Sequence, residues 1–295
     1  MIARPTVAAG FGFVFVVVVS GCVHGSGAWD EKALSYLLSV QQEDGGFSEA
    51  GSEGDYVTTL WVGIALQAQP SPSSALDRAD AFLRLRASHP PGTTLSDSNR
   101  ASLTLLYAAW AGADARDFGG QDLVASVEAH QNATGAVGNL PNENLIGALA
   151  LASAVGVESE TAWAACGWLD ALVWESRTVS HDGWYVATAI QAVAACREAV
   201  DGELVDEGLG LLETFRHDAG GFSAREGGPA DASTTANAVQ ALRAVGNEPG
   251  SEWESLIVGL QQESGAVAFR ADVAAPLIKT TAEVLLAQRS GLAPS

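Results

Sequence analysis

The sequence predicts an all-α protein built from six copies of one helical hairpin. Three observations support this class: a unit that recurs along the chain, apolar residues at helical spacing within each copy, and a Gly-rich turn between the two helices. The copies align on an anchor position in the second helix, and successive anchors lie 43 to 47 residues apart, a period typical of repeat architectures. The six anchors are Thr59, Ser102, Leu145, Thr188, Thr235 and Thr281.

Each unit is expected to contain a first helix, a turn and a second helix. Leu, Ala and Val recur in both segments at helical spacing rather than in strict alternation. The clearest first helices are expected at residues 33–42, 75–86, 162–174 and 205–215. The second helices are expected near residues 57–68, 100–112, 143–155, 185–196, 233–245 and 278–289.

The turn between the helices is clearest in the first and fifth units. Its paired glycines are expected to supply the positive φ of a tight reversal, which a residue with a Cβ resists. The Asp that precedes the second helix can accept hydrogen bonds from its free N–H groups. The structural residues of these two turns are Gly45, Gly46, Phe47 and Asp55, and Gly220, Gly221, Phe222 and Asp231.

Hairpins of this kind cannot bury their apolar faces alone, so neighbouring units must stack. Six units form either an open superhelix or a closed ring of twelve helices, and apolar runs on both helices favour a ring with two layers. Because the repeat is unbroken, residues 30–292 are predicted to form one domain. The units cover about residues 30–69, 73–112, 119–155, 159–199, 202–246 and 250–292.

The turns also share a Gln-x3-Gly-x-aromatic spacing, which is complete in Gln41, Gly45 and Phe47. Val takes the aromatic position in residues 131–137 and 261–267, and Arg216 replaces the Gln in the fifth unit. This pattern resembles the repeat of the terpenoid cyclase and protein prenyltransferase β-subunit superfamily, the prenyltransferase/squalene cyclase repeat. The resemblance covers about residues 30–292. It implies an (α/α)6 toroid of about twelve helices in two concentric layers around a central cavity.

The N-terminus has the features of an export signal. Arg4 precedes an apolar run at residues 7–19, and Val19-Ser20-Gly21-Cys22 follows. This resembles a bacterial lipoprotein signal, which implies removal of residues 1–21, lipidation of Cys22 and a tether at residues 22–29. The alternatives are an ordinary signal peptide or a transmembrane anchor, for which the run is short. We therefore expect an exported, extracytoplasmic protein that is attached to the bacterial cell membrane through Cys22.

Charge and cysteine content limit the partners. The formal net charge of −20 disfavours nucleic acid. Cys166 and Cys196 lie in the two helices of the fourth unit, at similar distances from the connecting loop. Export permits a disulfide between them, and the alternative is two small buried residues. The chain is expected to be a monomer without a cofactor, and its partner is a small molecule or a protein.

The repeat also predicts which residues face the cavity. Positions two before, two after and five after each anchor form one helical stripe that varies between units. The cavity candidates on this stripe are Trp61, Arg100, Tyr107, Glu143, Asn237, Lys279 and Glu283. A polar and aromatic cluster at the fourth turn adds His181, Asp182 and Trp184. The alternative is that these residues pair with each other, Arg100 with Glu143 and Lys279 with Glu283.

The catalytic residues that the resemblance implies do not match. A prenyltransferase zinc site needs Asp-x-Cys and a His, but this chain has Asp231-Ala232-Ser233 and no His near residue 279. The acidic D-x-D-D run of terpene cyclases is not found in the sequence either. We therefore expect no metal site and no catalytic residue, and lean against an enzyme.

The favoured hypothesis is a lipoprotein whose cavity binds a small amphiphilic or isoprenoid-like ligand, or a partner, without catalysis. The first alternative is an enzyme of the superfamily, of the prenyltransferase or terpene cyclase type. The second is a glycan-active (α/α)6 enzyme, in which carboxylates act as acid and base and aromatic rings stack on sugars. The residues available for that chemistry are Asp97, Glu143, Asp182 and Glu283, with Trp61, Trp184 and Tyr185.

Overall fold

The computed structural model describes residues 28–49, 54–70, 74–87, 95–170, 181–200, 202–218, 220–273 and 277–289. Within these ranges the chain forms twelve helices, and the only β pairing is a set of isolated bridges at the turns. The predicted signal segment and Cys22 lie outside the described residues. The first helix begins at Ala28 and buries Trp29, so it begins two residues before the predicted domain boundary.

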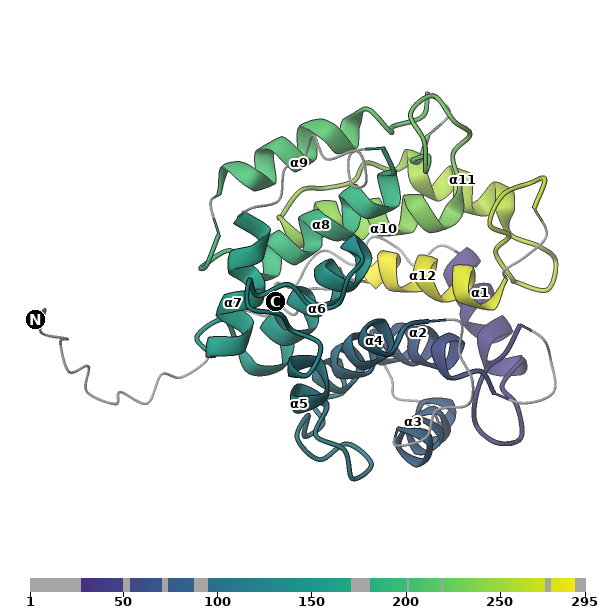
Figure 1. Ribbon diagram of the computed structural model, residues 1–295. Coiled ribbons are helices and arrows are strands. Elements are labelled where there is room, and N and C mark those ends of the chain that lie inside the picture. Colours follow the sequence, from purple (N-terminus) through teal and green to yellow (C-terminus); the bar gives the residue numbers. More distant parts are fainter. Residues whose placement is uncertain are drawn as a thin grey trace, which may run out of the picture.

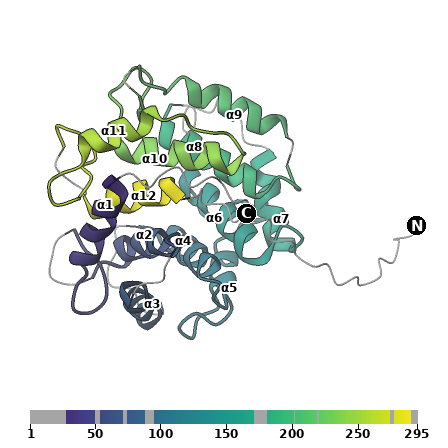
Figure 2. The ribbon, with the colours of Figure 1, turned by 180° about the vertical axis from the view of Figure 1, so that it is seen from behind.

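The helices form two layers, as the repeat predicts. The outer helices are α1 (Ala28–Ser39), α3 (Ser74–Arg86), α5 (Leu123–Glu128), α7 (Glu160–Asp170), α9 (Glu203–Glu213) and α11 (Glu252–Leu260). The inner helices are α2 (Tyr56–Gln67), α4 (Asp97–Trp110), α6 (Pro141–Val155), α8 (Gly183–Ala195), α10 (Ala232–Ala244) and α12 (Ile278–Arg289). Figures 1 and 2 show α3 and α9 on opposite sides of the molecule, with the inner helices between them.

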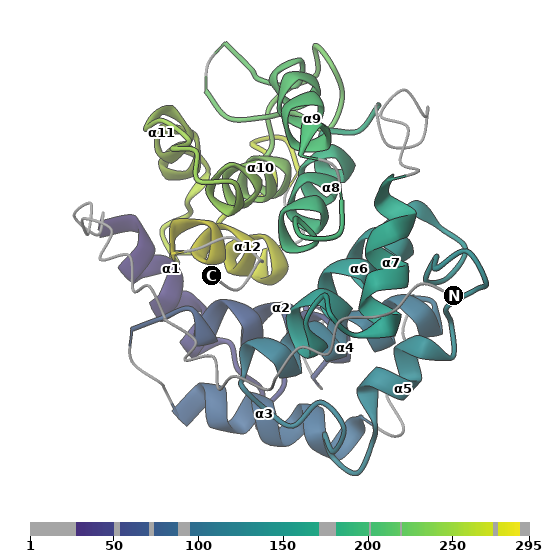
Figure 3. The ribbon, with the colours of Figure 1, turned by 90° about the vertical axis from the view of Figure 1, so that its left-hand side faces the viewer.

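The inner helices close into a ring. Each packs on the next along the chain, and α12 packs on α2, which joins the sixth unit to the first. The view in Figure 3 shows the inner helices around the centre and the outer helices outside them. The closed (α/α)6 toroid is therefore confirmed, and an open superhelix is excluded.

A Thr hydroxyl in the inner helix fixes each of the best-defined turns. The backbone N–H of Phe47 donates to Oγ1 of Thr59 over 2.9 Å, and that of Phe222 donates to Oγ1 of Thr235 over 2.8 Å. In the sixth unit the N–H of Val267 donates to Thr281 in the same way over 2.9 Å. All three Thr are anchors of the repeat, so this position is occupied by Thr because its hydroxyl holds the turn against the helix.

The glycines of the turns have two different roles. Gly45, Gly220 and Gly221 adopt positive φ of 88°, 93° and 78°, as predicted. Gly46 does not, which corrects the prediction that both glycines of a pair supply this conformation. A Cβ on Gly46 would lie 2.6 Å from the Cα of Gly54, so this position needs Gly because two backbone segments approach closely.

The predicted helix caps are also present. Asp55 accepts a hydrogen bond from the N–H of Thr58 over 2.7 Å, and Asp231 accepts one from the N–H of Thr234 over 2.7 Å. These bonds satisfy N–H groups that have no partner inside the helix. Phe47 and Phe222 are buried in the core. The structural role assigned to these repeat residues is therefore confirmed.

In the first, third and sixth units, the repeated Gln clamps the turn to the next outer helix. The Nε2 of Gln41 donates to the carbonyls of Gly45 and Ala75, at 2.7 and 2.8 Å, which links the first turn to α3. Gln131 bridges Gly135 and Thr161 at 2.9 and 3.0 Å, which links its turn to α7. One amide thus satisfies a carbonyl in its own unit and another in the following unit.

The same clamp closes the ring. Gln261 donates to the carbonyls of Gly265 and Trp29 at 3.1 and 2.7 Å, so the sixth turn is tied to α1. The Trp29 indole also meets the Trp253 indole edge to face at 6.0 Å. On the other side of the seam, the carboxylate of Glu49 accepts from the N–H groups of Leu277 and Lys279 at 3.1 and 2.9 Å.

A disulfide joins Cys166 and Cys196, with their Cα atoms 5.5 Å apart. The bond links α7 to α8 and encloses the 171–180 segment, which lies outside the described residues. The pairing that the sequence left open is therefore made. For a sequence separation of 30 residues, chain entropy predicts a stabilisation of about 3–4 kcal/mol.

Replacement of Gln261 by Ala should lower the free energy of unfolding by about 1–3 kcal/mol, because two carbonyls at the seam lose their donor. Urea unfolding, followed by circular dichroism, measures this change. Gln262→Ala is the matched control, since Gln262 is the next residue and its side chain is exposed. Equal stabilities of the two variants would contradict a role for the clamp in ring closure.

Candidate ligand site

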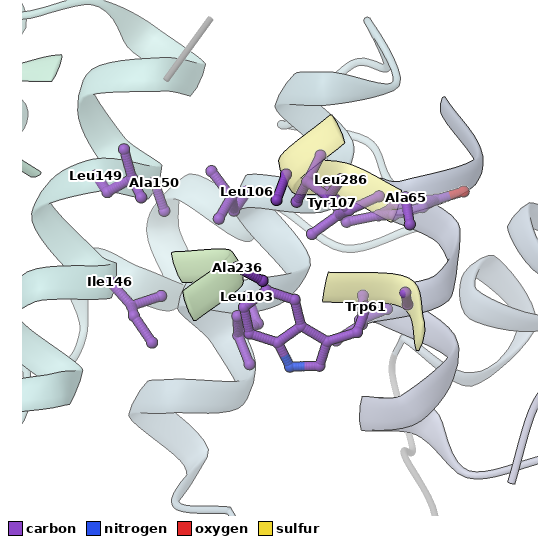
Figure 4. Packing of buried hydrophobic residues seen from close by; sticks show 14 of the residues in the cluster. Trp61, Ala65, Leu103, Leu106, Tyr107, Ile146, Leu149, Ala150, Ala236 and Leu286 are labelled. Atoms are coloured by element: carbon purple, nitrogen blue, oxygen red, sulfur yellow. The ribbon is translucent and has the colours of Figure 1, made fainter. Parts of the chain in front are cut away.

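The predicted cavity stripe occupies three levels along the inner helices. The first level lies in the first turn of each helix, and the other two lie successively deeper. At the deepest level all six side chains are buried, which indicates that packing closes this end of the lumen. These side chains are Ile64, Tyr107, Ala150, Val193, Gln240 and Leu286. In Figure 4, Tyr107, Ala150 and Leu286 lie among other buried apolar residues of the ring.

Tyr107 is not a cavity residue. Its hydroxyl donates to Asp80 of the outer helix α3 over 3.1 Å, and its ring meets Phe118 edge to face at 5.9 Å. The ring also fills the space above Gly63, where a Cβ would lie 2.6 Å from it. Burial, followed by the negative charge of Asp80, raises the pKa of Tyr107. Tyr107 therefore connects the two layers, because its long side chain reaches sideways between α2 and α4.

The side-chain amide of Asn237 bridges the two inner helices α8 and α10. Its Nδ2 donates to the carbonyl of Trp184 and to Oγ1 of Thr188, at 2.9 and 2.8 Å. Its Oδ1 accepts from Nε2 of Gln191 over 2.7 Å. Both ends of the amide thus hold α10 against α8, and the ligand-binding role predicted for Asn237 is replaced by a structural one.

Glu143 and Arg100 do not form the pair that the sequence suggested. Glu143 accepts from the hydroxyl of Ser96 and from the N–H groups of Asn139 and Leu140, at 2.6 and 3.1 Å for the latter two. Burial alone would raise the pKa of Glu143, but these hydrogen bonds hold it below its ordinary value. Arg100 instead pairs with Asp97 at 2.7 Å.

The fourth turn supplies a cap rather than a pocket. Asp182 accepts from the N–H groups of Trp184 and Tyr185, at 2.9 and 3.4 Å, and so begins α8. The rings of Trp184 and Tyr185 meet edge to face at 5.7 Å and are half-buried. His181 is exposed. The carboxylate of Asp182 therefore serves to accept backbone hydrogen bonds at the start of α8.

Three predicted residues do converge at the seam of the ring. The Nζ of Lys279 lies 2.6 Å from Oε1 of Glu283, which confirms that predicted pair, and 5.3 Å from the centre of the Trp61 indole. Trp61 comes from α2, whereas Lys279 and Glu283 lie one turn apart on α12. The Glu283 side chain is only 4% exposed and that of Lys279 is 33% exposed, so Lys279 separates the carboxylate from solvent.

Asp231 joins this group from the start of α10. It is only 2% exposed, and burial together with the negative charge of Glu283 raises its pKa despite the hydrogen bonds from Thr234. From the sequence, Asp231 was predicted only to cap its helix. The one signal for a position in the site was that Asp231-Ala232-Ser233 aligns with the Asp-x-Cys of the prenyltransferase pattern. We call Trp61, Asp231, Lys279 and Glu283 the seam cluster. It combines two buried carboxylates, one ammonium group and one aromatic face.

No group of three or more His, Cys, Asp or Glu within the described residues is arranged to hold a metal ion. A pocket of about 340 Å³ lies in the fifth unit between α9 and the end of α10, and no feature of the repeat predicted it. Its lining residues are Leu209, Leu212, Glu213, Arg216, Phe222, Leu242, Asn247 and Glu248.

Comparison with solved structures identifies the fold. The chain is similar to the type II terpene cyclase MstE from Scytonema, with a TM-score of 0.64, 18% identity, and coverage of 88% of this chain and 96% of that one. The chain has the (α/α)6 toroid fold. A protein from Actinoplanes gives a TM-score of 0.59 with 15% identity, covering 88% and 98% of the two chains.

A glycoside hydrolase shares the same fold. An inactive variant of the α-1,6-mannanase from Salegentibacter, in complex with α-1,6-mannotriose, gives a TM-score of 0.65 with 11% identity. The match covers 90% of this chain and 99% of that one. No protein-family model and no curated protein sequence matches the chain. At these identities the likeness establishes the architecture, and the chemistry must be argued from the residues of this chain.

Replacement of Asp231 by Asn should stabilise the protein at neutral pH. The folded-state pKa of Asp231 is raised, so its contribution to stability is present at low pH and is lost as pH rises through that pKa. Asn keeps the cap but carries no charge to bury beside Glu283. The advantage over the parent protein, measured by urea unfolding across a pH series, should shrink as pH falls toward 3.8.

Asp55→Asn is the matched control, because it alters the equivalent cap in the first unit, outside the seam cluster. A gain in stability that is the same at every pH, or no gain at all, would contradict the assignment of electrostatic strain to Asp231.

Proposed function

We propose that this protein is an exported, lipid-anchored binding protein that holds a small ligand at the seam cluster without transforming it. The observation that carries the proposal is the convergence of Trp61, Lys279 and Glu283 from two inner helices. Asp231, at the start of a third inner helix, lies near enough for the charge of Glu283 to raise its pKa, after the larger effect of burial. An aromatic face beside a few oriented polar groups is the usual composition of a small-molecule site. Lys279 is the most exposed of these four residues, so a ligand would enter by displacing its side chain.

The chemistry of the other carboxylates argues against a glycosidase. Such an enzyme needs one carboxylic acid and one carboxylate on either side of the bond that breaks. Asp97 is paired with Arg100, and Asp182 caps α8. Glu143 caps α6, and its lowered pKa makes it a poor proton donor. Their contacts give each of these groups a structural role.

The packing of the deepest level also limits the ligand. Because all six side chains at that level are buried, a long chain has little room to extend down the lumen. A free cation for an anionic head is lacking within the described part of the lumen wall, since Arg100 and Lys279 both pair with acids. The residues of the second level are buried as well. We therefore favour a compact ligand held near the first level, where it reaches the seam cluster, over the extended, anion-headed isoprenoid suggested by analogy.

Acid catalysis at the same cluster is the second candidate function. It is favoured by Asp231, a buried carboxylic acid whose raised pKa would let it keep a proton and donate it. The terpene cyclase and mannanase structures indicate that this fold supports enzymes. Binding and catalysis make different predictions for the mass of the bound molecule when Asp231 is replaced.

Native mass spectrometry of the full-length protein, extracted from its own membranes, should reveal a non-covalent small-molecule adduct. Trp61→Ala should reduce its occupancy several-fold, because an aromatic face contributes roughly 1 kcal/mol or more to binding. Trp163→Ala is the matched control, since Trp163 lies exposed on the outer helix α7. No adduct, or an adduct that Trp61→Ala leaves unchanged, would contradict a binding function at the seam.

The same measurement on Asp231→Asn separates the two candidates. A binding protein should retain an adduct of the same mass. An acid catalyst should accumulate its substrate, so the adduct would change in mass between the parent protein and the variant.

Lipid anchoring through Cys22 has its own test. The lipobox-like sequence supports it, and the Cys166–Cys196 disulfide supports residence in an oxidising compartment. No helix in the described residues has the length and apolarity to cross a bilayer. Palmitate labelling should be lost in Cys22→Ala and kept when Cys166 and Cys196 are both replaced by Ala. Labelling that persists in Cys22→Ala would indicate another anchor.

A further inference from the structure

The charges around the seam cluster do not balance. Asp231 and Glu283 are both acidic, and Lys279 is in direct contact with Glu283. Arg270 lies near enough for Asp231 to raise its pKa, after the larger effect of Asp272, but Arg270 is already paired with Asp272 at 2.5 Å. Glu49 adds another carboxylate at the start of α12. Four of these groups are acidic and two are basic, so negative charge is in excess, with Asp231 and Glu283 buried and Glu49 and Asp272 exposed.

One carboxylate oxygen in the cluster lacks a donor. Oε1 of Glu283 accepts from Lys279, whereas Oε2 is buried and has no hydrogen-bond partner among the described residues. A buried acceptor that stays unpaired costs about 1–3 kcal/mol, and more when it is charged. A ligand that brings an N–H donor to this oxygen would recover that free energy.

Lys279 itself illustrates the group that fits. Its ammonium lies over the Trp61 indole and bonds to Glu283, which is the arrangement that aromatic and acidic groups offer to organic cations. The negative charge of the whole chain also attracts cations toward its surface. An anionic ligand would meet two buried carboxylates and no unpaired cation within this cluster.

We propose that the ligand of the seam cluster is a small organic amine, whose ammonium group donates to Oε2 of Glu283 and lies against Trp61. This inference deepens the proposed function and rests on it. Lys279 then acts as an internal competitor, which holds part of the site until the ligand displaces it. The remaining body of the ligand lies toward the first level of the lumen, since the deepest level is filled.

Three probes of nearly equal size and shape test the charge preference: phenethylamine, 2-phenylethanol and 3-phenylpropionate. Their affinities for the full chain are measured by titration calorimetry near pH 8. The amine should bind at least about tenfold more tightly than the alcohol and the acid, because only an ammonium group gains from both the aromatic face and the carboxylate. Glu283→Gln should reduce amine affinity by about the same factor while leaving the alcohol unaffected.

Lys279→Met gives a result that a purely structural role would not produce. Removal of the internal competitor should tighten amine binding several-fold. Lys32→Met is the matched control, because Lys32 is the other lysine of the chain, lies exposed on α1, and its removal changes the net charge equally. Lys32→Met should leave the affinity unchanged. Thermal melts of each variant verify that it is folded.

Other outcomes overturn the inference. Equal or tighter binding of the alcohol or the acid would exclude a cation-selective site. If Trp61→Ala weakened that binding, the proposed binding function would stand while the ligand class was wrong. Weaker amine binding by Lys279→Met would show that Lys279 is part of the site rather than its competitor. Absence of binding by all three probes would also overturn the amine assignment, and the co-purification experiment would then decide the proposed function alone.

Discussion

The toroid is tied together at three of its six junctions by a side-chain amide that joins one unit to the next. Gln41, Gln131 and Gln261 each satisfy one carbonyl in their own turn and one in the first turn of the following outer helix. The last of these bonds spans 232 residues of sequence and closes the ring. Because one hairpin cannot bury its apolar faces alone, the register of neighbours must be fixed by polar contacts as well as by packing. That register places the first turns of the inner helices around one opening.

The fifth unit shows what happens when the amide is absent. Arg216 takes the Gln position, stacks over Phe222 at 4.8 Å and pairs with Glu213 at 2.6 Å. Its guanidinium is therefore committed within its own unit. The pocket of about 340 Å³ lies at this same place and includes all three residues in its lining. This departure from the repeat is thus accompanied by a local pocket between α9 and the end of α10.

The repeat predicted the fold because the interactions that define each hairpin lie within that hairpin. Caps, turn glycines and anchor Thr act within one hairpin, so their roles could be inferred from spacing. The cavity assignments were less successful, since helical phase gives the direction of a Cα–Cβ bond but not the end point of a long polar side chain. Tyr107 extends to Asp80 in the outer layer, and Asn237 turns toward α8. The proximity of Asp231 to Glu283 joins two units, so no pattern within one unit could reveal it.

Closure of the ring and formation of the seam cluster are the same event. Trp61 belongs to the first inner helix and Lys279 and Glu283 to the last, so the indole meets the Lys279–Glu283 pair only when α12 packs on α2. Asp231 and Glu283 come from the fifth and sixth units, and the packing of α10 against α12 must exceed the cost of burying these two acids near each other. Buried groups that lower stability in this way are typical of functional sites, because a sequence that was optimised for stability alone would replace them. A ligand that binds only the closed ring would in turn stabilise it, which links occupancy of the cluster to the integrity of the whole toroid.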